Sequence, residues 1–362
     1  MTSKLIIIAE AGVNHNGSLS KALELIDLAA EAKADYVKFQ TFKSEKVASR
    51  FAVKAEYQKK TTGEADTQLD MIRKLELSQD DHFVLQKHCA KRGIKFLSTP
   101  FDRDSLQFLL SMNVEKLKIA SGELTNAPLL YQAGKTGKPL ILSTGMATLA
   151  EIETALGVLA FAYVGHEKNI DEKSFRKAYA SQDGQRALKE KVTLLHCTTE
   201  YPAPFEDVNL RAMRTMSQAF DLPVGYSDHT PGIHVSLAAV ALGACIIEKH
   251  FTLDKNLPGP DHKASLSPEE LIQLVKQCRE VESSLGDGCK VPKPSEIKNI
   301  EIARRSIVAA ESIKKDGVFT SDNLEFKRPG TGLSPFLYWS LLGKKAHKDY
   351  VADEEIRNMD AS

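Results

Sequence analysis

Eight short apolar segments recur through the first 250 residues, and most are separated by a stretch with helical periodicity, such as TLAEIETALGVLAFAY at 148–163. Their apolar residues run continuously instead of alternating with polar ones, which is typical of parallel strands buried on both faces. Eight strand–helix repeats are the number found in a (β/α)8 barrel, so the sequence predicts an α/β fold of the TIM-barrel type. The predicted strands are residues 5–9, 35–39, 94–98, 115–120, 139–143, 192–197, 222–227 and 245–250.

A doubly wound open sheet uses the same strand–helix units and is the alternative architecture. In such a sheet a dinucleotide-binding protein carries G-x-G-x-x-G after its first strand. No such motif follows residues 5–9 here, so the usual dinucleotide signature is missing.

The character of the sequence changes after residue 285. A last barrel helix is predicted at 267–285, and a Gly-, Pro- and Lys-containing stretch then indicates a linker at 286–303. The module that follows is turn-rich, and at about 60 residues its own core should be marginal, so docking on another barrel would stabilise it. We therefore predict a catalytic domain at 1–285 and a small C-terminal domain at 304–362.

A long, highly charged stretch at 165–191 interrupts the repeat between the fifth helix and the sixth strand. In a barrel, such a connection lies at the amino-terminal face of the strands, away from the chemistry. We predict a surface elaboration that contains one helix, and assign it no role.

The amino-acid composition limits which binding partners and which cellular compartment are expected. Forty-eight basic residues balance forty-eight acidic ones, so no electrostatic footprint predicts binding to nucleic acid or to a membrane surface. The first apolar run is too short for a signal peptide, and no stretch is long enough to span a membrane. Five cysteines show no C-x-x-C spacing and an odd count, which indicates reduced thiols. A cytoplasmic location is the prediction.

Reactive polar side chains follow every predicted strand, at the end where the active sites of barrels lie. Lys38 and Lys118 stand within apolar runs, so each must reach solvent or an anion. The hydroxyls of Thr99, Ser121 and Ser143 can add directed donors for a phosphate or a carboxylate. For each single Ser or Thr, helix N-capping is the competing interpretation.

His229 and His250 end the seventh and eighth predicted strands, which become neighbours when a barrel closes. Neutral imidazole binds divalent transition metals, with carboxylate, substrate oxygen or water completing the coordination. Two histidines without a tight motif are also compatible with hydrogen-bonded loop residues, and the spacing alone leaves both interpretations open.

Taken together, the strand-end clusters resemble the sialic acid synthase family. The matching stretches cover nearly the whole chain in order, and the C-terminal segment RRSIVA to KRPGTG is similar to that family's antifreeze-like (SAF) module. They are IIIAEAGVNHNGS, YVKFQTFK, FLSTPFD, KIASGE, ILSTGMAT, LLHCTTEYPAPFEDVNL, GYSDHT, AAVALGACIIEKHFTLDK and GPDHKASL.

The resemblance implies a condensation in which C3 of phosphoenolpyruvate attacks the aldehyde of an open-chain N-acetylated mannosamine. Water adds to C2 of phosphoenolpyruvate, phosphate leaves by C–O cleavage, and the product is a nine-carbon 2-keto sugar acid. The resemblance also implies a divalent metal, usually Mn²⁺ with Mg²⁺ or Co²⁺ as alternatives, held by His229 and His250. It implies a domain-swapped homodimer in which Arg328 of one subunit contacts the sugar's N-acetyl group in the barrel of its partner.

Further site residues are carried over from the same resemblance. Phosphoenolpyruvate contacts fall on Lys38, Thr99, Lys118, Ser121, Ser143 and Tyr201, and residues facing the sugar and the reacting centre fall on Glu10, Gln40 and Asp261. Glu10 is the candidate for water activation or proton transfer, with Glu123 and Glu248 as alternatives. Thr199 stands where some members have an asparagine contact, so it is left out of the predicted contacts.

The expected product is N-acetylneuraminate, and the alternative is N,N'-diacetyllegionaminic acid, made from 2,4-diacetamido-2,4,6-trideoxymannose. The loop KAEYQKKTTGEADTQ after the second predicted strand lacks an asparagine that some members carry, which leaves the exact sugar open. Another metal-dependent aldolase-type barrel is a more distant alternative. A non-catalytic carbohydrate-binding barrel is also possible, but both lysines and both histidines are intact, whereas a decayed site should lose charges that are costly to bury.

Overall fold

The computed structural model describes residues 4–63, 65–165 and 169–357. The chain divides into two compact units, residues 1–286 and 287–362. Each unit has its own cluster of buried apolar side chains.

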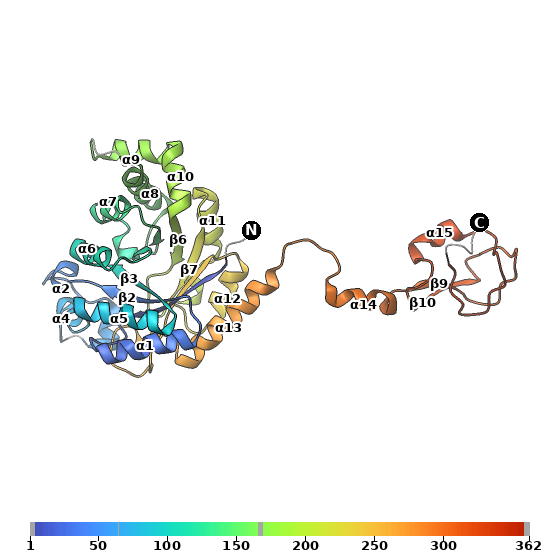
Figure 1. Cartoon of the computed structure of the whole chain (residues 1–362), viewed down its shortest axis with the longest axis horizontal. Coiled ribbons are helices and arrows are strands. Elements are labelled where there is room, and N and C mark those ends of the chain that lie inside the picture. Colours follow the sequence, from blue (N-terminus) through green and yellow to red (C-terminus); the bar gives the residue numbers. More distant parts are fainter. Residues whose placement is uncertain (1–3, 64, 166–168, 358–362) are drawn as a thin grey trace. The chain divides into compact units, whose positions relative to one another are not determined.

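The first unit is a barrel of eight parallel strands surrounded by helices (Figure 1). Consecutive strands are neighbours in the order β3-β2-β1-β8-β7-β6-β5-β4, and β1 pairs with β8. Within the described residues, β3 and β4 come together without a hydrogen-bonded ladder, so the barrel is nearly closed. The predicted (β/α)8 architecture is confirmed, and the doubly wound alternative is wrong. The strands are β1 Ile6–Gly12, β2 Tyr36–Thr41, β3 Lys95–Pro100, β4 Leu117–Ile119, β5 Leu140–Ser143, β6 Val192–Cys197, β7 Val224–Asp228 and β8 Ile246–His250.

The helices of this unit begin where the sequence supplies N-cap residues. Ser78, Thr148 and Ser267 each accept a backbone N–H three residues ahead, and an acidic residue at that position bonds back to the cap. The helices are α1 Leu19–Glu31, α2 Ser44–Val47, α3 Glu56–Thr62, α4 Gln68–Arg73, α5 Gln79–Arg92, α6 Arg103–Ser111, α7 Ala127–Lys135, α8 Leu149–Val164, α9 Glu172–Tyr179, α10 Gln182–Lys191, α11 Arg211–Phe220, α12 His234–Ala241 and α13 Pro268–Leu285, with short 3-10 turns η1 Ser121–Glu123, η2 Phe205–Asp207 and η3 His262–Ala264.

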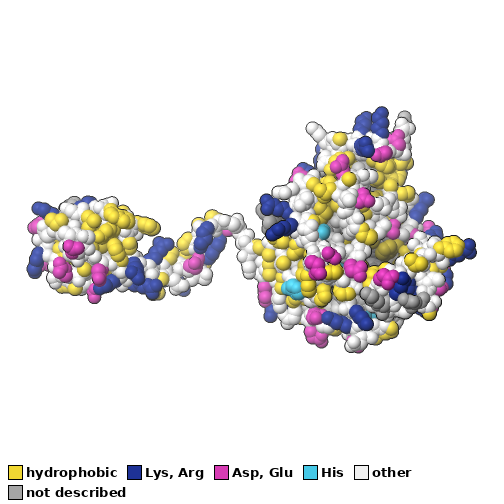
Figure 2. Space-filling view, turned by 180° about the vertical axis from the view of Figure 1, so that it is seen from behind, with side chains coloured by type: hydrophobic (Ala, Val, Ile, Leu, Met, Phe, Trp, Pro, Cys, Tyr) yellow, Lys and Arg dark blue, Asp and Glu magenta, His cyan; other side chains and the backbone are white. Residues whose placement is uncertain are grey.

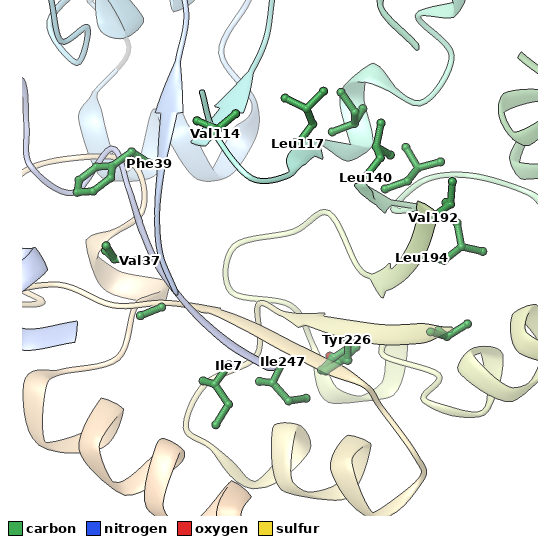
Figure 3. Close-up of a cluster of buried hydrophobic side chains, with 14 of the residues drawn as sticks. Ile7, Val37, Phe39, Val114, Leu117, Leu140, Val192, Leu194, Tyr226 and Ile247 are labelled. Atoms are coloured by element: carbon green, nitrogen blue, oxygen red, sulfur yellow. The ribbon is translucent and has the colours of Figure 1, made fainter. Parts of the chain in front are cut away.

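The core between the strands and the helices explains the continuous apolar runs. Ile7, Val37 and Ile247 stand on neighbouring strands and belong to this buried layer (Figure 3). Their chain neighbours point to the opposite face of the sheet, where a second and smaller apolar cluster lies. Both faces of each strand are therefore covered, as a parallel barrel requires.

The charged stretch 165–191 contains two helices, not the single helix that the sequence predicted. Its described part, 169–191, forms α9 and α10, and both pack against α8. Helix α8 is apolar on almost every side, with Leu156, Leu159 and Phe161 buried, so it needs a cover that a single layer of barrel helices would not provide. The elaboration is that cover.

The second unit is small, and its buried side chains include Ile307, Phe319 and Tyr350. It contains β9 Ser306–Ala309, which pairs antiparallel with β10 Leu324–Lys327, and the short helices η4 Pro335–Leu337 and α15 Tyr338–Leu341. Part of the predicted linker is helical, because α14 spans Pro294–Ala303 with no buried residue. The assignment of residues 304–362 to an antiparallel, antifreeze-like module stays a prediction.

Basic and acidic side chains alternate over the visible face of each unit, as the balanced totals predict (Figure 2). None of the helices in the described ranges is long and apolar enough to cross a membrane. All five cysteines are free thiols, and the cytoplasmic location stays a prediction.

Candidate active site

The barrel interior changes in character within two residues along six of the eight strands. Residues two apart on a strand point to the same face, so an inward-facing position is followed by another two residues later. The apolar interior cluster is Ile8, Tyr36, Leu97, Ile141, Leu195 and Ile246. The residues two positions further along these strands are Glu10, Lys38, Thr99, Ser143, Cys197 and Glu248. A polar layer thus rests on an apolar floor at the carboxyl ends of the strands, where active sites of this fold lie.

Two lysines and two glutamates contact one another in this layer. Lys38 Nζ lies 2.8 Å from Glu10 Oε1 and 3.7 Å from Glu248 Oε2. Lys118 Nζ lies 3.6 Å from Glu248 Oε1. All four side chains are buried, so these charges interact with little screening by water. Removal of any one of them leaves the others unbalanced.

Hydroxyl groups complete the contacts of this charge cluster. Lys38 donates to Thr99 Oγ1 at 3.3 Å, and Lys118 donates to Ser143 Oγ at 2.7 Å. Ser227 Oγ donates to Glu248 at 3.0 Å. Each lysine is therefore paired with a hydroxyl, an arrangement that can bind the carboxylate or phosphate of a small anion.

The two carboxylates of the cluster differ in their protonation. Burial raises the pKa of Glu10 to about 7, with Glu248 adding to the rise and Lys38 opposing it. Burial also acts to raise the pKa of Glu248, but Lys118 and Lys38 together lower it below its ordinary value. Glu248 is thus the anionic partner of the lysines, whereas Glu10 can exchange a proton near neutral pH.

The backbone at Gly145 lies close to the side chains of Ser121 and Thr199. The N–H of Gly145 donates to Ser121 Oγ at 3.0 Å, and Ser121 Oγ lies 3.1 Å from Cys197 Sγ. A Cβ at Gly145 would stand 2.3 Å from Thr199 Oγ1, so only glycine fits there. In the described part of the chain, the buried Thr199 Oγ1 has no hydrogen-bond partner, although the sequence analysis left this residue out of the contacts.

His229 and His250 lie side by side at the ends of β7 and β8. Their ring centroids are 5.6 Å apart, and the Tyr201 ring packs 4.2 Å from that of His229. His229 Nδ1 lies 2.6 Å from the carbonyl oxygen of Thr198, and a proton shared there leaves Nε2 with a free lone pair. Burial lowers the pKa of His229 to about 4 and that of His250 well below its ordinary value. Both rings are therefore neutral, as metal ligation requires.

This donor set fits a divalent metal ion. His250 Nδ1 has no hydrogen-bond partner within the described chain, and Asp261 Oδ2 lies 3.8 Å from it. Burial raises the pKa of Asp261 to about 6, and the charge of Lys38 opposes part of the rise. The described residues contain no cluster of three or more His, Cys, Asp or Glu side chains that could hold a metal. A metal on the two imidazoles would keep positions open for water or substrate oxygen, as catalytic sites do.

The loop that carries Asp261 is tied to the first βα loop. Asn14 donates from Nδ2 to Ser265 Oγ and to the carbonyl oxygen of Phe251, both at 2.8 Å. Ser265 Oγ donates in turn to the carbonyl oxygen of Asp261 at 2.7 Å. Through its Nδ2 group, Asn14 therefore helps to hold the position of Asp261, which its place after the first strand did not reveal.

A cavity of about 210 Å³ opens beside His250 and Asp261. Its polar lining includes Gln40, Tyr57 and Tyr201, and the Tyr57 and Tyr201 rings lie 5.1 Å apart. Gln58 also lines the cavity, and the rest of the wall is apolar. Most of the apolar residues come from the connection between β2 and β3, and the others follow β1, β3 and β8. These apolar residues are Val13, Phe42, Val47, Met71, Ile72, Leu75, Phe101 and Pro260.

The structure brings the predicted barrel residues to one end of the barrel, in three adjoining groups. The charge cluster contains Glu10, Lys38, Thr99, Lys118 and Ser143, Ser121 lies beside Gly145, and the remaining predicted residues surround the histidines: Tyr201, His229, His250, Asp261 and Gln40. Arg328 lies in the second unit, exposed after β10. Its reach into a partner's barrel stays a prediction.

The sequence did not predict that Glu248 is the shared ion-pair partner of both lysines. Glu248 was considered only as an alternative general base. Its position two residues before His250 on the same strand was the available signal, because the two must share a face. The other alternative base, Glu123, lies in η1 and accepts from Asn126 Nδ2 at 2.7 Å, outside the charge cluster. Tyr57 was missed because nothing in its loop sequence fixes its direction.

Comparisons with known proteins agree along nearly the whole chain. The chain is 52% identical over 354 residues to N,N'-diacetyllegionaminic acid synthase of Campylobacter jejuni, covering 98% of this chain and 99% of that protein. It is 45% identical to N,N'-diacetyllegionaminic acid synthase of Legionella pneumophila, covering 94% and 89%. The crystal structure of N-acetylneuraminic acid synthetase from Leptospira borgpetersenii, in complex with citrate, matches with a TM-score of 0.67 and 37% identity, covering 83% and 91%.

The family model covers the barrel itself. The model of the NeuB family matches residues 25–290, which include seven of the eight strands and both histidines. Because this match spans most of the chain and the relatives align almost end to end, the chain belongs to the NeuB family.

Proposed function

We propose that this chain is a nonulosonic acid synthase that condenses phosphoenolpyruvate with 2,4-diacetamido-2,4,6-trideoxymannose to N,N'-diacetyllegionaminic acid, with release of phosphate. This is the alternative of the sequence analysis, and it replaces N-acetylneuraminate as the expected product. Relatives at 52% and 45% identity carry the legionaminic name, whereas the sialic acid synthetase stands at 37%.

The cavity beside His250 and Asp261 is the observation that carries the choice of sugar. Its wall is largely apolar, and the described residues that line it include no lysine or arginine. A 6-deoxy sugar with two acetamido groups presents methyl groups that gain from such a wall. A sugar 6-phosphate would place a dianion there without a counter-charge, at a large desolvation cost.

The charge cluster is proposed to hold phosphoenolpyruvate. Lys38 and Lys118 supply the positive charges. Thr99 and Ser143 orient the two ammonium groups by accepting hydrogen bonds from them. Ser121 and the Gly145 N–H offer further polar contacts for a phosphate. Glu10, with its pKa near 7, is the proposed group for accepting a proton from the water that adds to C2.

A divalent metal, Mn²⁺ with Mg²⁺ or Co²⁺ as alternatives, is proposed on His229 and His250. When bound, it would supply Lewis-acid polarisation of the aldehyde oxygen. Asp261 and Tyr201 border the same place, and Gln40 faces the adjoining cavity. These residues are proposed to orient the open-chain sugar, so that its aldehyde carbon meets C3 of phosphoenolpyruvate.

Phosphate release from phosphoenolpyruvate with Mn²⁺ tests the sugar directly. We expect kcat/KM to be at least about 100-fold higher for the diacetamido sugar than for N-acetylmannosamine, because each acetamido or methyl group in an apolar pocket contributes about 10-fold or more. N-acetylmannosamine 6-phosphate should not be used. A preference for N-acetylmannosamine would overturn the choice of sugar and leave the condensation chemistry in place.

A pair of variants locates this preference in the cavity. Ile72→Ser, on its apolar wall, should lower kcat/KM for the diacetamido sugar without a matching loss for phosphoenolpyruvate. Val53→Ser is the matched control, since Val53 is 81% exposed and lies outside the cavity lining. Equal effects of both variants would remove the assignment of this wall.

We also propose that Arg328 acts in the barrel of a partner subunit. Arg328 is exposed, and Phe336 and Trp339 of the same unit are 92% and 77% exposed, which suits docking on another protein surface. Exchange of an identical element between protomers is a common route to such dimers.

Arg328→Ala should raise KM for the sugar by about 10-fold or more, because a charge-assisted contact is lost. If the site is shared, dimers made by co-expressing the Arg328→Ala and His250→Ala chains should regain activity, since one of their two sites is intact. Arg305→Ala is the control, because Arg305 instead donates to the carbonyl oxygen of Phe326 within its own unit. Mixed dimers without activity would contradict the exchange.

A further inference from the structure

A buried ion pair lies on the outer side of β7 and β8, directly behind the two histidines. Lys249 Nζ lies 2.9 Å from Asp228 Oδ2, and the two side chains are 1% and 0% exposed. Neither group belongs to the charge cluster inside the barrel, because their neighbours Ser227 and Glu248 occupy the inward positions. The proposed chemistry therefore leaves this pair without a task.

The pair holds Thr230, the residue that directly follows His229. Asp228 Oδ1 accepts the backbone N–H of Thr230 at 2.8 Å and its hydroxyl at 2.7 Å. Lys249 Nζ donates to the carbonyl oxygen of Thr230 at 2.7 Å. Both backbone groups of Thr230, the residue after His229, are thus fixed by the pair. Ser236 on α12 adds a hydrogen bond to Asp228 Oδ2 at 2.6 Å.

The same pair ends the ladder between the two strands that carry the histidines. Asp228 and Lys249 are the last register partners of β7 and β8, and His229 and His250 follow them immediately. Lys249 is also a register partner of Ala9 on β1, one residue before Glu10. Any change in the spacing of this pair would change the separation of the two imidazoles.

Stability alone does not explain a charged pair in this place. The layer between the strands and the helices is otherwise apolar and includes Tyr226, Val240 and Phe251, although the Tyr226 hydroxyl lies 3.5 Å from Asp228 Oδ1. The Lys249 ammonium is cut off from water, because its side chain is 1% exposed. Apolar residues of similar volume commonly stabilise a fold as well as a buried ion pair does, whereas directional bonds fix a geometry.

We propose that Asp228 and Lys249 are positioning residues that set the separation and orientation of His229 and His250 for a divalent cation. This inference rests on the metal site of the proposed function. Two contacts of the pair fix the backbone N–H and the carbonyl oxygen of Thr230, next to His229. The hydroxyls of Thr230 and Ser236 hold the Asp228 carboxylate in place.

The test is the affinity of the full chain for Mn²⁺, measured by electron paramagnetic resonance and compared with thermal unfolding. The double variant Asp228→Asn/Lys249→Met removes both charges and keeps an oxygen for Thr230, so its unfolding temperature should stay near that of the wild type. Its Kd for Mn²⁺ should rise about 10- to 100-fold, the usual effect of losing a partner that orients a metal ligand. Its kcat should fall while KM for phosphoenolpyruvate changes little.

Two further variants keep the inference open to refutation. Thr230→Val removes one hydrogen bond to Asp228 without changing any charge, and should weaken Mn²⁺ binding in the same direction even if the double variant does not fold. Arg279→Met breaks an ion pair with Asp35, in which the N···O distance is 2.5 Å. Asp35 directly precedes β2, so this ion pair lies at the opposite end of the barrel. Arg279→Met should lower stability and leave Mn²⁺ affinity unchanged.

The possible outcomes separate this inference from the proposal on which it rests. Wild-type Mn²⁺ affinity in both Thr230→Val and the folded double variant would overturn the positioning role alone. A wild-type chain that binds no Mn²⁺ would overturn the metal site and the positioning role together. A change in unfolding temperature without a change in affinity would make the pair purely structural.

Discussion

Replacement of His250 by alanine is expected to lower kcat by more than about 1,000-fold, the scale reached when a group that acts as part of a catalytic unit is removed. The variant loses one of the two neutral imidazoles that form the proposed metal site. Its fold should persist, because His250 Nδ1 has no hydrogen-bond partner within the described chain. Phosphate release and Mn²⁺ affinity, measured on the same preparation, check both statements.

The control for this variant is His234→Ala. His234 begins α12 close to His229 in sequence, but it is exposed and its ring packs against Phe205. This variant should keep wild-type turnover and Mn²⁺ affinity. Full activity of His250→Ala, or of the wild type in strongly chelating buffer, would refute the metal assignment.

The fold was predictable because its constraints are local. A continuous apolar run such as VTLLHC at 192–197 indicates a strand buried on both faces, and the repetition of such runs sets their number. The helix starts were marked in the same way by Ser78, Thr148 and Ser267. The carboxyl ends of the strands then identify where the active site lies, although they do not identify the contacts within it.

The contacts depend on how strands far apart in sequence align, which one sequence does not reveal. Lys38 was predicted to meet an anion, and in the structure its partners are Glu10 on β1 and Glu248 on β8. That pairing follows from the closure of the barrel between β1 and β8, where Glu10 and His250 are register partners. Nothing in the sequences around Lys38, Glu10 and Glu248 tells whether Lys38 contacts these glutamates or a ligand.

Apart from the role of Glu248 on β8, the features that were wrong or missed lie outside the strands. The 165–191 stretch was predicted to hold one helix because its charge masks the two short amphipathic helices that cover α8. The cavity wall from Ile72, Leu75 and their neighbours comes from the long connection between β2 and β3, whose short helices take their place by packing against the barrel mouth. In the proposed function the choice of sugar depends on that wall, so it could not be made from the strand-end motifs.

Lys118→Met is expected to lower kcat/KM for phosphoenolpyruvate by about 100- to 1,000-fold, as loss of one oriented donor in a site that excludes water does. Lys118 is buried against Ser143 Oγ and Glu248, and without it two glutamates face a single lysine, so the site repels an anion. The fold should tolerate the change, because burial already lowers the pKa of Lys118 and a methionine needs no hydration. Steady-state kinetics with varied phosphoenolpyruvate and thermal unfolding measure the two effects. Lys116→Met is the control, because Lys116 precedes β4 and packs over the Tyr36 ring instead of joining the charge cluster. Unchanged saturation by phosphoenolpyruvate in Lys118→Met would mean that the buried charges balance one another for the sake of the fold and that the anion binds elsewhere.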